Sequence, residues 1–219
     1  MAKTLEDILK DISTYVDQAD DTPTGEDLAV RTRLVNRRLR TYGESYDWQE
    51  LRTEYGFITS QVSQATISLP TNFKKLASPL YYYVSSVPRV YTEIDPSRSY
   101  EADSSDYVFY IMGNEATGFN LIVPNGLPSG ASLVMQYQSF PSSVASLSDT
   151  ISINTPEYLV QGVIADVLEG RADERFQIAQ ANAGTILANA LEKEHTRRSN
   201  SGVNTMDNYY RSINFRIGE

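Results

Sequence analysis

The segment 155–198 constrains the fold of this chain more than any other part of the sequence. Thr155 suits a helix N-cap, Pro156 is tolerated in a first helical turn, and apolar residues cover most sides of residues 157–169. After Gly170, apolar residues recur at helical spacing in one Ala-rich stripe: Phe176, Ala179, Ala183, Ile186, Leu187, Ala190 and Leu191. The pattern predicts a buried helix followed by a long amphipathic helix, which the earlier segments must cover.

The composition argues against several classes of protein. The chain has no cysteine, so it has neither a disulfide framework nor thiolate chemistry. Its formal net charge of -9 argues against nonspecific nucleic-acid binding by the chain as a whole. No apolar run approaches the roughly 20 residues of a membrane helix, and the N-terminal residues form an acidic amphipathic pattern instead of a signal peptide. We therefore expect a soluble protein with no membrane partner.

The first 55 residues show helical periodicity. Residues 4–18 read as a helix in which Thr4 is the N-cap and Asp7, three positions on, completes a capping box. A second helix is expected from about Glu26 to Tyr42, ended by Gly43, and Trp48 follows in a short helical turn.

From Gly56 the period changes from helical to alternating. Strands are expected within 66–70, 80–92, 107–112, 119–123 and 132–138, separated in part by Gly- and Asn-rich loops at 113–118 and 124–130. Pro88 interrupts the second of these stretches, and residues 96–106 form a polar connection that includes a helical turn. Connections this short predict an antiparallel meander or a small barrel.

The order of these segments predicts an α+β protein that is mainly α. In this prediction a helical bundle is built from both chain ends, an antiparallel β domain is inserted in it, and an extended tail follows. The expected boundaries are 1–55 for the N-terminal helices, 56–140 for the β domain, 141–198 for the C-terminal helices and 199–219 for the tail.

Residue types that carry catalysis are sparse. His195, the only histidine, lies in a charged segment at a helix end, where the helix dipole favours a cation. The acidic loop with Glu101, Asp103 and Asp106 lacks the glycine and the final glutamate of a calcium loop, and the loop 113–118 lacks the Lys-Ser/Thr of a phosphate cradle. The sequence therefore predicts no catalytic, cofactor-binding or metal-binding residue, and a protein that is not an enzyme. A carboxylate pair for glycoside hydrolysis remains an alternative, because sequence alone does not pair the many Asp and Glu residues.

The expected second helix carries a cluster of arginines, in an otherwise acidic N-terminal region. The cluster comprises Arg31, Arg33, Arg37, Arg38 and Arg40. Three interpretations remain open: a solvated or salt-bridged helix face, an inter-subunit surface on which Arg pairs with carboxylates, and direct nucleic-acid contact.

The final segment, 204–219, follows a linker-like stretch and is rich in apolar residues. We predict that it binds a partner through Met206, Tyr209, Tyr210, Ile213, Phe215 and Ile217. Ile213, Phe215 and Ile217 alternate with polar residues, which is the period of a strand. Such a strand either folds back on the β domain of its own chain or adds to another subunit or protein.

Several short patterns occur in a familiar order. They are Asp47-Trp-Gln-Glu-Leu51 after two helices, Ile67-Ser-Leu-Pro-Thr-Asn-Phe73, Leu133-Val-Met-Gln-Tyr137 with a following Phe-Pro, Leu147-Ser-Asp-Thr, and Thr155-Pro-Glu-Tyr158 before a helical pair. In this order the chain resembles the head-to-tail adaptor proteins of tailed bacteriophages, also called head completion or connector proteins, over residues 4–198.

The resemblance implies a structural protein of the virion neck, assembled in the host cytoplasm. Copies of the chain are expected to form a ring, dodecameric in this class, between the portal protein and a downstream tail or neck protein. DNA would pass through the channel of the ring without specific binding, and an acidic lumen would let the duplex slide. The alternatives are another tail or baseplate subunit, and a carbohydrate-binding module or carboxylate-dependent hydrolase on the β domain.

Overall fold

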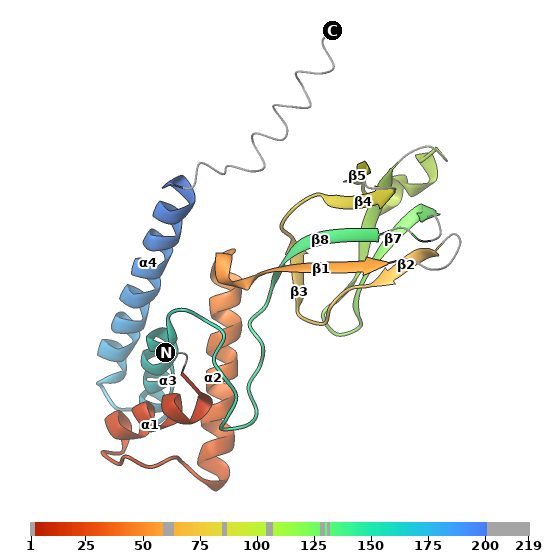
Figure 1. Cartoon of the computed structure of the whole chain (residues 1–219). Helices are drawn as coiled ribbons and strands as arrows, with labels where there is room; N and C mark the ends of the chain where they lie inside the picture. Colours follow the sequence, from red (N-terminus) through yellow and green to blue (C-terminus); the bar gives the residue numbers. More distant parts are fainter. Residues whose placement is uncertain are drawn as a thin grey trace. The chain divides into compact units, whose positions relative to one another are not determined.

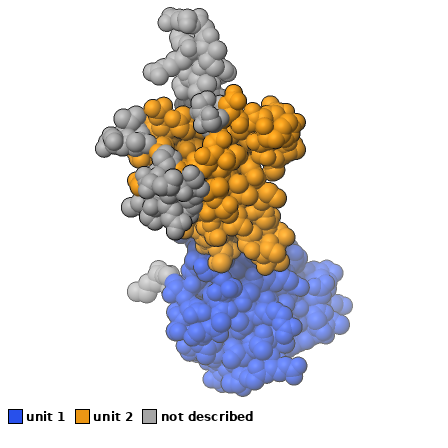
Figure 2. Space-filling model, turned by 90° about the vertical axis from the view of Figure 1, so that its right-hand side faces the viewer, with its two compact units in different colours: residues 1–50, 141–219 blue, residues 51–140 orange. Residues whose placement is uncertain are grey.

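The computed structural model describes residues 3–58, 64–84, 87–103, 107–127, 130 and 132–200. The chain divides into two compact units, coloured separately in Figure 2. Residues 1–50 and 141–219 form the helical unit, and residues 51–140 form the sheet unit.

The helical unit is organised around one buried helix. Its helices are α1 (Leu5–Val16), α2 (Gly25–Ser45), α3 (Pro156–Gly170) and α4 (Phe176–Asn200), and the short 3₁₀ helix η1 (Gln49–Leu51) leads out of it (Figure 1). Helix α3 packs against the other three α-helices. Its buried residues lie on most sides of the helix, as its sequence predicts: Tyr158, Leu159, Val160, Gly162, Val163, Ile164, Ala165 and Leu168.

Helix α1 begins with the capping box that the sequence predicts. The Thr4 hydroxyl accepts a hydrogen bond from the Asp7 N–H, and the Asp7 carboxylate accepts one from the Thr4 N–H. The loop before α3 runs alongside this helix start, where the Leu5 N–H donates to the Asp149 carbonyl and the Ile151 N–H donates to the Lys3 carbonyl. The first helical turn is therefore tied to a segment more than a hundred residues away in sequence.

Helix α2 does not end at Gly43, as the sequence pattern predicts, but continues to Ser45. Gly43 is buried within the helix. The Trp48 ring stacks on Tyr42 with centroids 4.2 Å apart, and the Trp48 Nε1–H donates to the Tyr42 carbonyl at 2.8 Å. Because an indole satisfies a carbonyl near the helix end, a glycine cap is not needed to end this helix.

The two C-terminal helices are separated where the sequence predicts a break. Pro156 occupies the first turn of α3, although the Thr155 side chain makes no capping hydrogen bond. Between the helices Ala172 adopts a φ of 55°. Ala179 and Ala183 of α4 are buried, whereas Ile186, Leu187 and the other members of the predicted stripe beyond them are half-buried.

The sheet unit contains one eight-stranded sheet. Its strands are β1 (Arg52–Ile58), β2 (Gln64–Ser68), β3 (Phe73–Leu76), β4 (Leu80–Val84), β5 (Val87–Glu93), β6 (Val108–Asn114), β7 (Gly118–Leu127) and β8 (Ser132–Ser139). They are ordered β1-β8-β4-β5-β6-β7-β2, and β3 also pairs with β8. The 3₁₀ helix η2 (Pro96–Glu101) connects β5 to β6.

The prediction of a mainly α bundle carrying a small antiparallel β domain is therefore wrong. The protein is of mixed α/β composition, its large sheet is curled, and β5 and β6 are parallel, with Thr92 opposite Val108. The sequence pattern missed two strands, β1 and β3: it predicts an alternating period from Gly56 but no strand before residue 66, whereas β1 starts at Arg52. Alternation is visible only where one face of a strand is apolar, and the exposed start of β1 and the lysines of β3 conceal it.

One face of the curled sheet encloses an apolar core. The residues of this core that are less than 2% exposed are Leu80, Phe109, Leu121, Val123, Leu127, Leu133 and Met135. These residues come from strands that are distant in sequence. Strand β8, for example, pairs with β1, β3 and β4, which all lie much earlier in the chain. Closing this core thus requires long-range pairing.

Two residues of β6 test this assignment of the core. Phe109 is 1% exposed and Met112 is 50% exposed. We expect Phe109→Ala to lower the free energy of unfolding by about 3–5 kcal/mol, because it leaves a cavity among packed side chains. Met112→Ala is the matched control, with an expected change within about 0.5 kcal/mol. Equal changes in the two variants, measured by urea denaturation, would contradict the assignment.

Candidate interaction surface

The five arginines of α2 fall into two groups. Arg31 is only 3% exposed, and its guanidinium donates to the Ser13 hydroxyl and to the Asp17 carboxylate. Arg38 is half-buried and donates two hydrogen bonds to Asp166 on α3, at 2.9 and 2.6 Å. These two arginines serve the interior of the helical unit and are not available to a partner.

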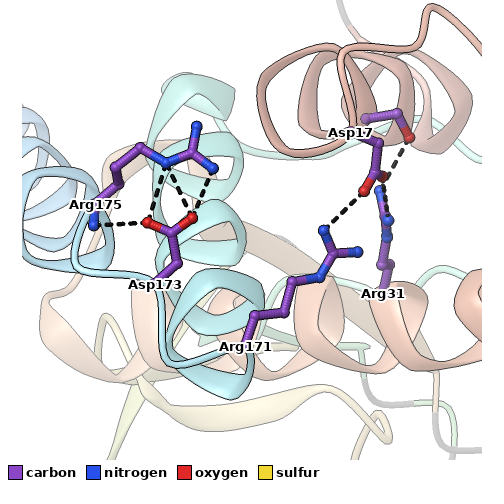
Figure 3. A network of polar contacts seen from close by, with 6 residues as sticks. Asp17, Arg31, Arg171, Asp173 and Arg175 are labelled. Carbon is purple, nitrogen blue, oxygen red and sulfur yellow. Dashed lines mark hydrogen bonds and ion pairs between the residues drawn. The ribbon is translucent and has the colours of Figure 1, made fainter.

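Asp17 lies at the centre of a small polar network at the end of α1 (Figure 3). Arg171, just after α3, donates to the same carboxylate at 2.9 Å, so that Asp17 links α1, α2 and the α3–α4 connection. Burial opposes ionisation of Asp17, but the hydrogen bonds from Arg31 and Arg171 outweigh it and lower its pKa. The sequence alone did not indicate this pairing, because Asp17 and Arg171 are 154 positions apart.

Among the ion pairs of the described residues, Asp166 is the most buried carboxylate of the helical unit. Its side chain is 5% exposed, and both Arg38 and Arg37 pair with it. Gly162, one turn earlier on α3, leaves room for Arg38, because a Cβ at this position would lie 3.0 Å from the Arg38 Nε. The glycine thus allows the guanidinium to reach a carboxylate on a helix that is otherwise apolar.

The second group of arginines faces solvent. The Arg37 side chain is 60% exposed despite its contact with Asp166. Arg33, one turn away, is exposed, and no ion pair is found for it among the described residues. Arg40 pairs with Glu44 on the same helix at 2.7 Å. The exposed basic face of α2 therefore centres on Arg33 and Arg37, which lie at i and i+4.

An acidic segment precedes this basic face. Asp20, Asp21, Glu26 and Asp27 are all exposed. Glu26 and Asp27 lie in the first turn of α2, where the helix dipole favours negative charge. The helical unit thus presents exposed carboxylates at the start of α2 and exposed guanidiniums further along the same helix.

The other candidate residues are not grouped into a reactive site. His195 is exposed on α4 and lies beside Tyr46, with ring centroids 5.2 Å apart. Glu101 pairs with Arg98 at 2.9 Å, and Asp106 lies outside the described residues. Across the described ranges, no three His, Asp or Glu side chains are arranged so that they could hold a metal ion.

Residues 115–117, within the predicted loop 113–118, form the hairpin connection between β6 and β7, and the flanking residues of that segment belong to the two strands. The Asn114 carboxamide oxygen accepts hydrogen bonds from the N–H groups of Ala116 and Thr117, both at 2.9 Å. These contacts use the side chain to hold the turn, as expected of a hairpin loop.

The helical unit also contains a pocket that the sequence did not indicate. Its volume is about 440 Å³, and residues of α1, α3 and α4 line it, together with Lys3. Two carboxylates, Asp11 and Glu157, belong to the lining, and Asp11 pairs with Lys3 at 2.6 Å. The pocket is on the helical unit and not on the sheet unit, which is where the alternative of a hydrolase or carbohydrate-binding module places its site.

The partner-binding residues expected in the tail lie outside the described residues. These are Met206, Tyr209, Tyr210, Ile213, Phe215 and Ile217. Their assignment stays a prediction from the sequence.

The chain shows no match to known proteins in two comparisons. Neither a protein-family model nor a curated protein matches it. Within the part of the chain that the structure describes, no helix is long and apolar enough to cross a membrane.

The two groups of arginines differ in their expected effect on stability. We expect Arg31→Met to lower the free energy of unfolding by about 3 kcal/mol, because it leaves Asp17 and Ser13 without a buried donor. Arg33→Met on the same helix is the matched control, with an expected change within about 0.5 kcal/mol. Chemical denaturation measures both variants. An equal loss of unfolding free energy in Arg33→Met and Arg31→Met would contradict the division of the arginines into an internal and an exposed group.

The lowered pKa of Asp17 predicts a specific pH dependence. Because its folded-state pKa lies below the value of 3.8 taken for the free side chain, the ionised carboxylate stabilises the fold above that pH. This stabilisation is lost as the pH falls from there through the folded-state pKa. We therefore expect Asp17→Asn to have a lower free energy of unfolding than the natural chain at pH 7, and this difference to become smaller below about pH 4. Asp21→Asn, on the exposed linker, is the control. If the stability difference between Asp17→Asn and the natural chain did not change with pH, the stabilising role of the ionised Asp17 carboxylate would be refuted.

Proposed function

We propose that this chain is a structural, non-enzymatic subunit of a head-to-tail adaptor in a tailed bacteriophage. In this proposal copies of the chain form a ring in the virion neck, in contact with the portal protein and with a downstream tail or neck protein. The resemblance of the ordered short patterns supports the class of protein. DNA would pass through the ring without sequence-specific contacts.

The observation that supports self-association is that exposed basic and exposed acidic residues lie on separate parts of the helical unit. Arg33 and Arg37 face solvent on α2, while Asp20, Asp21, Glu26 and Asp27 are exposed at its start. A ring places two different surfaces of neighbouring subunits in contact, so a basic face on one copy can meet an acidic segment on the next. Arg is well suited to such contacts because its planar guanidinium forks with carboxylates.

The division of the arginines strengthens this argument. Arg31 and Arg38 are held inside the unit by Asp17 and Asp166, so their positive charge is already compensated. Arg33 and the exposed part of Arg37, which also contacts Asp166, remain for intermolecular contact. The net charge of -9 also suits a channel wall that repels DNA instead of binding it.

Localisation in the particle tests the class of protein. A full-length chain with an epitope tag at either end would be expressed in the cells that produce it, and purified particles would be labelled with gold-conjugated antibody. We expect gold at the head–tail junction in negative-stain images. Label at the tail tip or baseplate would indicate the tail-subunit alternative, and particles without label from either tag would overturn the proposal.

Charge exchange tests the interface between copies. Arg33→Glu should reduce incorporation into particles by about tenfold, because exposed ion pairs worth roughly 0.2–1 kcal/mol each recur around a ring. Arg37 is left unchanged, because it also pairs with the buried Asp166 and a carboxylate at this position would disturb the fold. Adding Asp20→Arg and Asp21→Arg to the Arg33→Glu chain should restore incorporation. Arg98→Glu, at a side chain that is 71% exposed in the sheet unit, is the control. Normal incorporation of the Arg33→Glu chain, or no recovery when Asp20→Arg and Asp21→Arg are added to it, would refute this interface.

A further inference from the structure

Three tyrosines and one arginine gather in the sheet unit where its apolar core meets solvent. This tyrosine cluster consists of Tyr82 on β4, Arg89 and Tyr91 on β5, and Tyr107 just before β6. Arg89 lies directly opposite Tyr82, and the Tyr91 ring packs edge-to-face against Tyr82 and Tyr107, with centroids 5.9 and 5.5 Å apart. Strand β5 pairs with β4 on one side and with β6 on the other, and this pairing brings the four side chains together (Figure 1).

The hydroxyl groups of Tyr82 and Tyr91 have no hydrogen-bond partner within the described ranges. The two residues are only 2% and 4% exposed. Every fully buried side-chain oxygen or nitrogen of the described residues has a partner, so these two hydroxyls must retain contact with solvent. A buried tyrosine usually bonds its hydroxyl, because an unpaired polar group costs free energy. Both hydroxyls are therefore available to a ligand that reaches the cluster.

Arg89 adds a positive charge beside these hydroxyls. Its guanidinium carbon lies 5.4 Å from the centre of the Tyr107 ring, which is a cation–π arrangement, and the residue is exposed. No carboxylate pairs with Arg89 in the part of the chain that the structure describes, whereas Arg98 pairs with Glu101 at 2.9 Å. The guanidinium is thus free to pair with an anion from outside the chain.

Both hydroxyls keep their protons at neutral pH. Burial raises the pKa of Tyr91 to about 12, and the neighbouring Tyr82 and Tyr107 add to this effect. Burial also raises the pKa of Tyr82, and Tyr107 adds to the rise, whereas the charge of Arg89 opposes it. The two phenols can therefore donate hydrogen bonds to the same ligand that the guanidinium attracts.

This combination of groups fits a carboxylate. A carboxylate has two oxygens that accept hydrogen bonds, and a guanidinium forks onto both of them. The cluster holds one positive charge, which balances one carboxylate, whereas grooves that follow a nucleic-acid backbone align several cations. The exposed Tyr107 ring adds the aromatic surface that is common at the centres of protein interfaces.

We propose that the tyrosine cluster binds an Asp or Glu side chain of another protein of the virion neck. Arg89 pairs with its carboxylate, and the Tyr82 and Tyr91 hydroxyls donate to it. The identity of this partner rests on the proposed adaptor function. In that proposal the exposed carboxylates of neighbouring copies contact Arg33 and Arg37, so a different protein supplies the carboxylate for the sheet unit.

Titration with a small dicarboxylate tests the chemistry of the site in the isolated full chain. Sodium glutarate would be added at constant ionic strength while the ring resonances of ¹³C-labelled tyrosines are followed by NMR. We expect saturable shifts at Tyr82 and Tyr91, and about tenfold weaker binding in Tyr82→Phe and in Tyr91→Phe, because each removes a hydrogen bond to a charged group. Tyr83→Phe is the matched control, since the neighbouring residue of a strand points to the opposite face. Shifts that do not saturate, or equal binding of sodium phosphate, would overturn the inference.

The same variants separate binding from folding. Neither hydroxyl makes a hydrogen bond within the described ranges, so Tyr82→Phe and Tyr91→Phe should leave the midpoint of urea unfolding unchanged. A lower midpoint in either variant would show that the hydroxyl serves the fold, and would contradict its assignment to a ligand.

Photo-crosslinking in particles identifies the partner. Tyr107 would be replaced by p-benzoyl-phenylalanine in the full chain, and we expect crosslinks to an Asp- or Glu-containing segment of the portal or a downstream neck protein. Arg89→Gln should lower their yield roughly fivefold, because it removes the charged donor, whereas Arg98→Gln, an exposed arginine of the same unit, should not. Crosslinks confined to copies of this chain would overturn the inference. If gold marks the neck but glutarate does not bind, only this inference fails; if glutarate binds as expected but particles carry no gold, only the adaptor proposal fails.

Discussion

The helical unit depends on one buried ion pair, in which arginines of α2 compensate the negative charge of Asp166 on α3. A helix that is apolar on most sides is excluded from water, so a charge on it is costly unless it is paired and hydrogen-bonded. Asp166 receives two hydrogen bonds from Arg38 and a further contact from Arg37. Gly162 keeps the path of Arg38 clear, since a Cβ there would lie 3.0 Å from its Nε. This ion pair ties α2 to α3, against which α1 and α4 also pack.

The same interaction determines which charges remain at the surface. Arg31 and Arg38 are neutralised by Asp17 and Asp166, whereas Arg33 and the outer part of Arg37 face solvent. Internal pairing and external recognition thus use neighbouring residues of one helix. This is why five arginines in a short segment do not act as a single basic patch, and why the proposed contact between copies is limited to two of them.

Local chemistry explains which parts of the fold and of the surface were predictable. The capping box of Thr4 and Asp7, the buried helix after Pro156 and the break after Gly170 all depend on residues within a turn or two of each other. The end of α2 was predicted wrongly although it is also local, because Trp48, six positions after Tyr42, donates to the Tyr42 carbonyl and the helix continues past Gly43 to Ser45. Among the surface residues, the cluster of arginines was visible in the sequence, but its division was not, because Asp166 is 128 positions from Arg38.

The capped N-terminal helix, the buried α3 and the presence of several strands can be predicted from the residues alone, because side-chain periodicity and capping act over a few residues. The folded chain adds what no local pattern contains: the strands form a single eight-stranded sheet, β5 and β6 run parallel, and β1 is the last strand in the strand order. The physical reason is that strand order and register are set by hydrogen bonds between segments far apart in the chain. Arg52 and Gln138, for example, lie opposite each other across β1 and β8, and no local pattern encodes that pairing.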